Sequence, residues 1–452
     1  MQVFVRLLVR NSGNTASRGA VAAFFVAALL NGQTDTMRNG PVDPGPRTGT
    51  PGAGGPIKGL VGNEAGVFRA GLDAFQQVNS VTGTLTGDAG LGPTFNLDSC
   101  GGCHSQPAIG GSAPKVNPQV AVANKAGASN KIPSFITLDG PVREARLIRN
   151  GAASGGVAAL FTIQGRTDAP GCNIAQPDFA NAVATNNVSF RIPTPVFGSG
   201  LIEAIGDSTI LANMSSRLDQ KSRKGISGHP NRSGNDGSMT RFGWKAQNKS
   251  LMVFAAEAYN VEQGVTTDLF MQERDSTPGC QFGSTPEDHM DVNAGNIQDA
   301  IGDVIKFTFF MRMLAPPARG LSNPSVANGE ALFNSTGCSL CHTPSLQTSP
   351  NTTEAISNKT ANLFSDLIVH NMGAGLADGV SQGAAGPSEF RTAPLWGLGQ
   401  RLFFLHDGRT PNLLEAIRAH SSTGSEANAV VDDFNALLTS QKQDILNFLR
   451  SL

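Results

Sequence analysis

Charge is scarce in this sequence, and neither sign dominates. Charged residues make up 15% of the 452-residue chain, and 34 basic against 35 acidic side chains leave a formal net charge of −1. This balance does not indicate a nucleic-acid partner, because nucleic-acid-binding proteins carry a clear basic excess. The chain also contains 53 glycines, so we expect a body with many loops and irregular segments.

Long apolar runs are missing as well. A membrane-spanning helix needs about 20 apolar residues, and the apolar run 19–30 is much shorter. Three arginines precede this run and polar residues follow it, an order typical of a secretory signal. We therefore predict a signal peptide or N-terminal anchor over 1–34 and a flexible Gly/Pro linker over 35–57. No clear Ala-x-Ala cleavage site follows, so an uncleaved anchor, and with it membrane association, stays an alternative.

Cysteine is rare, yet four of the six cysteines lie in two copies of one motif. The motif is Cys-x-x-Cys-His, and its members are Cys100, Cys103 and His104, then Cys338, Cys341 and His342. It is the attachment signature of c-type haem, in which both thiols bind the porphyrin and the histidine ligates the iron. A structural zinc site would need a second ligand pair nearby and a thioredoxin-like site a βαβ context, and neither pentad has them. The sequence therefore predicts two covalently bound haems and a redox function.

The remaining cysteines are Cys172 and Cys280. Covalent haem attachment takes place outside the cytoplasmic membrane, so we expect an exported, periplasmic protein, in whose compartment thiols pair. We predict a disulfide between the two cysteines and assign neither a catalytic role. Two separate buried thiols are the alternative.

Periodic apolar residues and prolines indicate how the chain is divided. Apolar residues at three- and four-residue steps predict a helix over 297–314, which Pro316 and Pro317 end. We place a domain boundary after it. An N-terminal haem domain would then cover 58–321 and a C-terminal cytochrome c domain 322–452.

Two further segments complete this organisation. The apolar pattern over 441–452 predicts the helix that closes the second domain. From about 131 to 290 the pattern weakens into short runs between Gly, Asn and Pro clusters, which we interpret as an insertion of short helices and loops with little strand. The predicted fold is thus mainly α with extensive loops, with two cytochrome c-like haem domains, the first carrying a large insertion.

Several longer motifs resemble those of one family. They are Phe95–Cys100, Asp139–Arg146, Pro195–Ile205, Arg241–Lys245, His370–Gly373, Arg391–Trp396 and Phe404–Arg409. With the pentads they resemble the di-haem oxidoreductases, some of which are labelled thiol oxidoreductases, over residues 58–452. This family is related to the bacterial di-haem cytochrome c peroxidases, the methylamine dehydrogenase maturation enzyme and the di-haem rubber oxygenases. Some relatives hold a calcium ion between the domains, which leaves calcium open here.

The resemblance also implies the axial ligands of the second haem. In the peroxidase relatives the residue that closes the second axial position follows a Phe-x-His-Asp-Gly turn, which leads from His406 to His420 here. His342 and His420 would hold a six-coordinate, low-spin electron-transfer haem. Met372 is the competing ligand, because Met with His is a common cytochrome pair. His406 is expected near a propionate or in support of its loop.

The first haem differs, because nothing close in sequence can cap its iron. After His104 the next methionine is Met214 and the next histidine is His229. We expect a five-coordinate haem that binds peroxide or dioxygen. The alternative is that Met214, His229, His289 or Met290 folds back to cap it.

Peroxide cleavage needs a group that moves a proton between the two oxygens. Glu203, in an apolar run, and Glu144 are the candidates, because apolar surroundings raise the pKa of a carboxyl group. An ion pair with an arginine is the structural alternative for each. The only tryptophans, Trp244 and Trp396, are expected in the core or on the electron path between the haems.

These observations predict an exported di-haem c-type oxidoreductase with peroxidase-like chemistry at the His104 haem and electron transfer through the second haem. Two alternatives stay open: a pure electron carrier with both irons six-coordinate, and dioxygen-dependent cleavage of a hydrophobic substrate. The expected partners are a redox protein or small-molecule electron donor, together with peroxide, dioxygen or an unidentified substrate. Thiol oxidation has no support, because no reactive thiol pair is left over.

Overall fold

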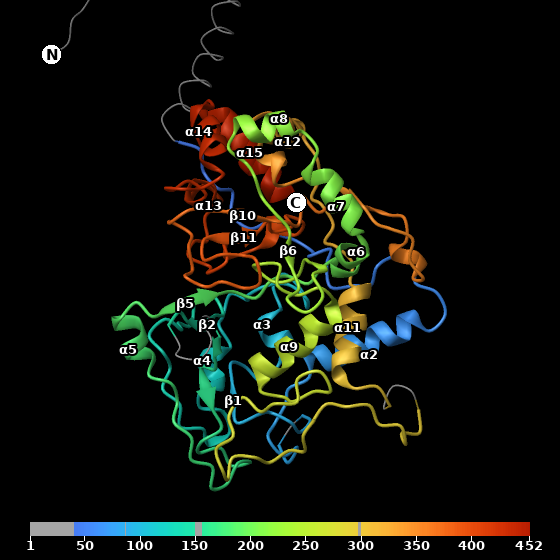
Figure 1. Cartoon of the computed structure of the whole chain (residues 1–452), viewed down its shortest axis with the longest axis vertical. Coiled ribbons are helices and arrows are strands. Elements are labelled where there is room, and N and C mark those ends of the chain that lie inside the picture. Colours follow the sequence, from blue (N-terminus) through green and yellow to red (C-terminus); the bar gives the residue numbers. More distant parts are fainter. Residues whose placement is uncertain (1–39, 86, 150–155, 297–299) are drawn as a thin grey trace, which may run out of the picture.

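The computed structural model describes residues 40–85, 87–149, 156–296 and 300–452. The predicted signal segment 1–34 lies outside these residues, as does the start of the helix predicted over 297–314. Helices and loops dominate the described chain, and its strands are short (Figure 1). No helix in this part of the chain has the length and apolar character to cross a bilayer.

The α-helices of the described residues are α2 (Glu64–Gln76), α3 (Cys100–Cys103), α4 (Gln119–Val122), α5 (Phe179–Ala184), α6 (Ser199–Ala204), α7 (Asp207–Met214), α8 (Leu218–Arg223), α9 (Leu251–Gln263), α11 (Asp303–Met313), α12 (Pro324–Ser335), α13 (Leu413–Ala419), α14 (Asn428–Ala436) and α15 (Thr439–Ser451). Short 3₁₀ helices are η1 (Lys125–Gly127), η2 (Cys338–Leu340), η3 (Glu354–Ile356) and η4 (Leu398–Gln400).

The strands form one antiparallel sheet of three strands and several antiparallel pairs. The sheet has the order β3 (Val157–Ala158), β2 (Glu144–Leu147) and β5 (Val188–Arg191). The pairs are β1 (Thr94–Phe95) with β4 (Phe161–Thr162), β6 (Asn231–Arg232) with β7 (Met239–Thr240), β8 (Leu346–Gln347) with β9 (Thr360–Ala361), and β10 (Val369–Asn371) with β11 (Glu389–Arg391). Segment 131–290, expected as helices and loops with little strand, therefore contains the sheet as well as α5 to α9.

Two helix pairs are built in the same way. In the C-terminal part α12 packs along α15, and in the N-terminal part α2 packs along α11 (Figure 1). Gly329 of α12 lies so close to α15 that a Cβ there would stand 2.0 Å from the Asp444 carbonyl oxygen, and a Cβ on Gly71 of α2 would stand 2.4 Å from that of Lys306 in α11. Only glycine permits these two crossings.

Both predicted helices are present, but the one expected over 297–314 begins only at Asp303, as α11, because the backbone of Gly302 before it is extended. Asn323 caps α12 by accepting a hydrogen bond from the Val326 N–H, and Pro324 occupies its first turn. Helix α11 ends at Met313, before the prolines, and α15 covers the segment predicted to close the chain. The apolar face of α15 packs in a core whose members all come from residue 326 onward. The predicted domain boundaries themselves stay a prediction.

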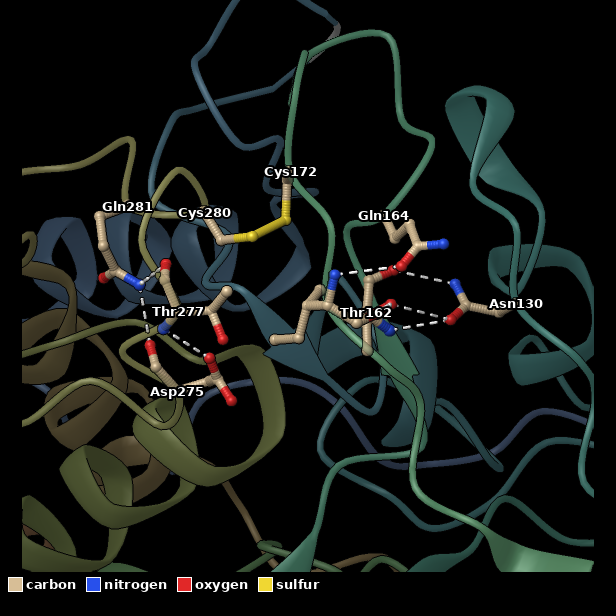
Figure 2. Close-up of a disulfide and its surroundings, with 9 residues drawn as sticks. Asn130, Thr162, Gln164, Cys172, Asp275, Thr277, Cys280 and Gln281 are labelled. Carbon is tan, nitrogen blue, oxygen red and sulfur yellow. Dashed lines mark hydrogen bonds between the residues drawn. A yellow bond between two sulfur atoms is a disulfide. The ribbon is translucent and has the colours of Figure 1, made fainter.

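The strand-containing middle of the chain has its own core and a disulfide. Cys172 and Cys280 are bonded to each other, 108 residues apart (Figure 2). Both are buried in a core with Phe95, Phe161 and Ile163. The bond joins the loop after β4 to the loop around Cys280, so the alternative of two separate thiols does not describe this structure.

Residues 40–57 form a strap on the C-terminal part of the molecule. The flexible linker expected over 35–57 has neither helix nor strand where it is described, but it is attached. Asp43 pairs with Arg450 of α15 at 2.8 Å and accepts a hydrogen bond of 2.7 Å from the Leu413 N–H, where α13 begins. Both charged side chains are buried, at 5% exposure. The Gly/Pro-rich composition does not reveal these contacts.

Candidate haem sites and the cavity between them

The first pentad lies on α3, with its histidine at the end of the helix. His104 Nδ1 lies 3.0 Å from the Gly111 carbonyl oxygen. Because a carbonyl oxygen only accepts, Nδ1 carries the hydrogen and Nε2 keeps a free lone pair, which is the tautomer of an iron ligand. Burial lowers the pKa of His104 to about 4, so the ring is neutral. The Phe75 ring packs edge-on against it, with centroids 5.9 Å apart.

The second pentad, which begins in η2, repeats this arrangement. His342 Nδ1 lies 3.0 Å from the Phe364 carbonyl oxygen, and the Phe333 ring lies beside the imidazole at 6.3 Å. His420, directly after α13, holds its Nδ1 2.7 Å from the Ala416 carbonyl oxygen. All three predicted iron ligands are thus the same tautomer. Burial, with a smaller contribution from His420, lowers the pKa of His342 to about 4.

His342 and His420 line one cavity of about 1450 Å³, counting its part open to solvent. Its walls include both cysteines of the second pentad and many apolar side chains from α12 to α15. These features fit a haem attached at the pentad. Met372, the competing ligand, lines the same cavity, and the choice between it and His420 stays a prediction.

The first pentad lines a second cavity of about 1110 Å³, again counting its open part. Among its lining residues only His104 and Met311 carry an imidazole or a thioether. Met311 belongs to the core that contains Phe75. None of the four side chains expected as alternative caps, Met214, His229, His289 and Met290, is in this lining.

Two carboxyl groups meet in the cavity of the first pentad. Glu144 on β2 pairs with Arg146 and hydrogen-bonds to Glu262, near the end of α9. Burial and the charge of Glu144 raise the pKa of Glu262 to about 8, so Glu262 holds a proton at neutral pH. Asn96 donates a 2.8 Å hydrogen bond to Glu262 Oε2. The arrangement is therefore one protonated and one charged carboxyl group in contact.

The sequence singled out Glu144 but missed Glu262. Ala255, Ala258 and Glu262 lie at helical spacing on one side of α9, and all three line the cavity. This spacing could have indicated Glu262. Glu203, the other candidate, pairs with Arg312 at 2.7 Å and accepts a hydrogen bond from the Leu251 N–H at the start of α9. It is not in the cavity lining, so its contacts match the structural alternative.

A third, smaller cavity of about 500 Å³ shares lining residues with each of the other two. Trp244 lines all three cavities, whereas Trp396 lines only the third. The Trp244 indole N–H donates to the Ile192 carbonyl oxygen at 2.9 Å, and its ring packs edge-on against His406. Arg391 and Arg401 line both the cavity of the second pentad and the third cavity.

A calcium ion between the domains stays an expectation. Among the described residues, one group of three His, Cys, Asp or Glu side chains lies close enough to share a metal ion: Cys341, Asp366 and His370. Calcium takes oxygen ligands, and Cys341 belongs to the second pentad. His370 is instead held between two carboxylates, with Nε2 2.9 Å from Asp366 and Nδ1 2.7 Å from Glu426.

The chain is similar to known haem proteins in sequence and in structure. A family model described as "Di-haem oxidoreductase, putative peroxidase" matches residues 157–452 and so includes the second pentad. No curated protein matches.

Several solved structures are similar at low identity. The Kuenenia stuttgartiensis hydrazine synthase pressurised with xenon has 15% identity and a TM-score of 0.22, over 35% of this chain and 56% of that chain. A MauG-like protein associated with microbial copper homeostasis has 16% identity and a TM-score of 0.30, over 57% of this chain and 90% of that chain. The diheme peroxidase BthA from Burkholderia thailandensis E264 has 12% identity and a TM-score of 0.28, over 68% of this chain and 92% of that chain. The chain thus spans little more than half the length of the hydrazine synthase chain.

Proposed function

We propose that this chain, which belongs to the di-haem oxidoreductase family, reduces peroxide at one haem with electrons supplied through the other. The family model matches more than half of the chain and identifies a haem-dependent oxidoreductase with two haems. The proposal adds covalent attachment at the two pentads, the division of roles between the sites, and export.

The observation that carries the proposal is the cavity of the first pentad. It combines a neutral His104 with a free Nε2, a protonated Glu262 and a charged Glu144. A haem held there by Cys100, Cys103 and His104 would supply the iron at which peroxide is reduced. Reduction breaks the O–O bond of peroxide, takes up two electrons and two protons and releases two water molecules.

The two carboxyl groups would handle the protons. Glu262 holds a proton at its carboxyl group at neutral pH and donates it to the departing oxygen. Glu144, which forms an ion pair with Arg146, accepts the hydrogen bond of Glu262 and would pass a proton to it from the incoming peroxide. Both come from segment 131–290, which gives the proposed insertion its function.

The second site would transfer electrons. His342 and His420 both present a free Nε2, which suits a six-coordinate haem that binds no substrate. The electrons would come from a redox protein or a small-molecule donor. The disulfide and the pentads support export, because both form in an oxidising compartment.

Replacement of Glu262 by Gln tests the proposal, because the amide keeps the shape of the side chain but cannot donate the proton in the same way. We expect peroxide turnover to fall about a hundredfold, with both haems attached and their spectra unchanged. Glu203→Gln, whose carboxylate lies outside the lining, should retain most of the rate. A wild-type rate in E262Q would remove the acid role from this residue.

Electron paramagnetic resonance separates the competing functions. A high-spin signal that shifts with cyanide is expected from the first haem, beside an unmoved low-spin signal. Two low-spin signals that ignore cyanide would favour the electron carrier. Turnover with dioxygen and polyisoprene, in the absence of peroxide turnover, would favour the oxygenase.

A further inference from the structure

Two buried arginines lie next to each other without a counterion. Arg391 and Arg401 are 9% and 8% exposed. Among the residues that the structure describes, neither guanidinium forms an ion pair, although Arg391 Nε donates a 3.0 Å hydrogen bond to the Gly243 carbonyl oxygen. Buried charges in proteins are normally paired, because an unpaired one loses its hydration without compensation.

The environment of the two side chains makes the missing partner more evident. Burial lowers the pKa of Arg401 to about 10 with no acidic group opposing it. Burial together with Arg401 lowers the pKa of Arg391 to about 10, although Asp366, which forms no ion pair with it, opposes this shift. Two other buried arginines of this region have a carboxylate in contact: Arg191 pairs with Asp378 at 2.7 Å and Arg450 with Asp43 at 2.8 Å. Arg391 and Arg401 lack such a contact.

Both arginines line the cavity of the second pentad as well as the third cavity. Apart from these arginines, the cavity of the second pentad is lined largely by apolar side chains. A ligand of this cavity that matches the pair must carry two negative charges at neighbouring positions. Haem has an apolar macrocycle and two propionate carboxylates, whose two negative charges balance the positive charges of the two guanidiniums.

We propose that Arg391 and Arg401 bind the two propionates of the haem attached at Cys338 and Cys341. Arginine suits this role because its planar guanidinium forms paired hydrogen bonds to a carboxylate. The pair would fix the haem within its cavity and stabilise the reduced iron through two nearby positive charges. The inference rests on the proposed haem site at this pentad, and it requires no peroxide activity.

The test is redox potentiometry of the purified di-haem protein carrying Arg401→Gln or Arg391→Gln. In each variant we expect the reduction equilibrium of the low-spin haem to shift at least tenfold toward the ferric form, which equals 59 mV for one electron. The high-spin haem should keep its equilibrium. Arg401→Lys, which keeps the charge but not the fork, should show a smaller shift.

Arg409→Gln is the matched control, because Arg409 lies nearby in sequence but is exposed and paired with Asp407. Haem content and the thermal transition show whether each variant is folded and loaded, and the lysine variant covers a glutamine variant that fails to fold. Unchanged low-spin potentials in both glutamine variants would overturn the proposal. A shift confined to the high-spin haem would overturn it too, because the pair would then serve the first haem.

One further arm separates haem carboxylates from a soluble carboxylate. Addition of succinate to the wild-type protein should change neither potential. A succinate-dependent shift that disappears in R401Q would mean that the pair is open to a free ligand, and would overturn the propionate assignment. If the wild type shows no peroxide turnover while the glutamine variants show the expected potential shifts, the result would count against the proposed function alone.

Discussion

At the scale of single residues, the local signals of the sequence identified the pentads but not their surroundings. A Cys-x-x-Cys-His pentad has a fixed spacing, so it is readable without knowledge of the fold. Glu262 has its pKa raised by burial and then by Glu144, which lies on a distant strand. Arg391 and Arg401 likewise become a pair only through burial in a shared cavity. Properties that depend on tertiary neighbours have no pattern in a single sequence.

Lys245 is a buried side chain whose ammonium group contacts three oxygen atoms. Its ammonium nitrogen lies 2.8 Å from the carbonyl oxygens of Gly386 and Glu389 and 3.1 Å from Asp378 Oδ1. The side chains of Lys245 and Asp378 are completely buried. Two carbonyl oxygens and a carboxylate are ligands that calcium also uses, and here the ammonium group occupies the position between them.

We therefore expect the thermal transition of the wild-type protein to be insensitive to the chelator EGTA. Lys245→Ala should destabilise the protein by about 3 kcal/mol or more, because it leaves buried oxygens without their cation. Calcium at millimolar concentration should raise the transition of K245A only. Calorimetry with Lys249→Ala, an exposed ion-pair variant, provides the control. A fall in the wild-type transition on EGTA addition would show that the protein does bind calcium.

At the scale of elements, the helices were predictable and the strands and the strap were not. Helices α12 and α15 have apolar residues at helical spacing, and both are present where this pattern occurs. The strands have two to four residues, too few for an alternating pattern to register. Helices α2 and α12 share a deeper likeness: each has a Gly at its crossing and a Phe four residues later, Phe75 or Phe333, beside the pentad histidine. This repetition supports the proposal of two cytochrome c-like units.

The strap should position the helix that ends next to His420. Asp43 holds both the first turn of α13 and Arg450 of α15. In Asp43→Asn we expect a destabilisation of about 3–5 kcal/mol, because Arg450 becomes an unpaired buried charge. Part of the second haem should become high-spin, in proportion to the loosening of α13. Chemical denaturation and paramagnetic resonance measure the two effects, with His420→Ala as the reference for complete loss of this ligand.

The same variant should change the response to acid. Burial alone would raise the pKa of Asp43, but hydrogen bonds from Arg450, Leu413 and Gly45 hold it below its ordinary value. A carboxyl group with a lowered pKa stabilises the folded state above its unfolded pKa of about 3.8 and loses this contribution as the pH falls further. The difference in stability between wild type and D43N should therefore shrink below about pH 4. Glu330→Gln, which breaks an exposed pair with Arg319, should show little effect at any pH.

At the scale of the whole molecule, the three cavities share lining residues. The middle of the chain contributes to the sites of both pentads. Trp244 lines all three cavities, and Arg217, at the start of α8, donates a 2.5 Å hydrogen bond to the Ser339 carbonyl oxygen within the second pentad. In Figure 1 the green helix α8 lies beside the red C-terminal helices, and Lys224, directly after α8, pairs with Asp433 of α14. The sequence did not indicate this contact. Its apolar pattern and prolines predicted a boundary after residue 321, which assigned the middle of the chain to the first pentad alone.

We therefore expect electrons to pass between the two proposed haems through Trp244. Trp244 is 8% exposed, and it lines the cavities of both pentads. Trp244→Phe should slow electron transfer between the haems and lower peroxide turnover about tenfold, or about 1.4 kcal/mol of activation free energy. Stopped-flow reduction of the high-spin haem by the low-spin haem measures this directly. Trp396→Phe is the matched change in a residue that lines only the third cavity. It should leave the rate of electron transfer between the haems close to wild type. Equal rates in both variants and the wild type would mean that electrons pass between the sites by another route.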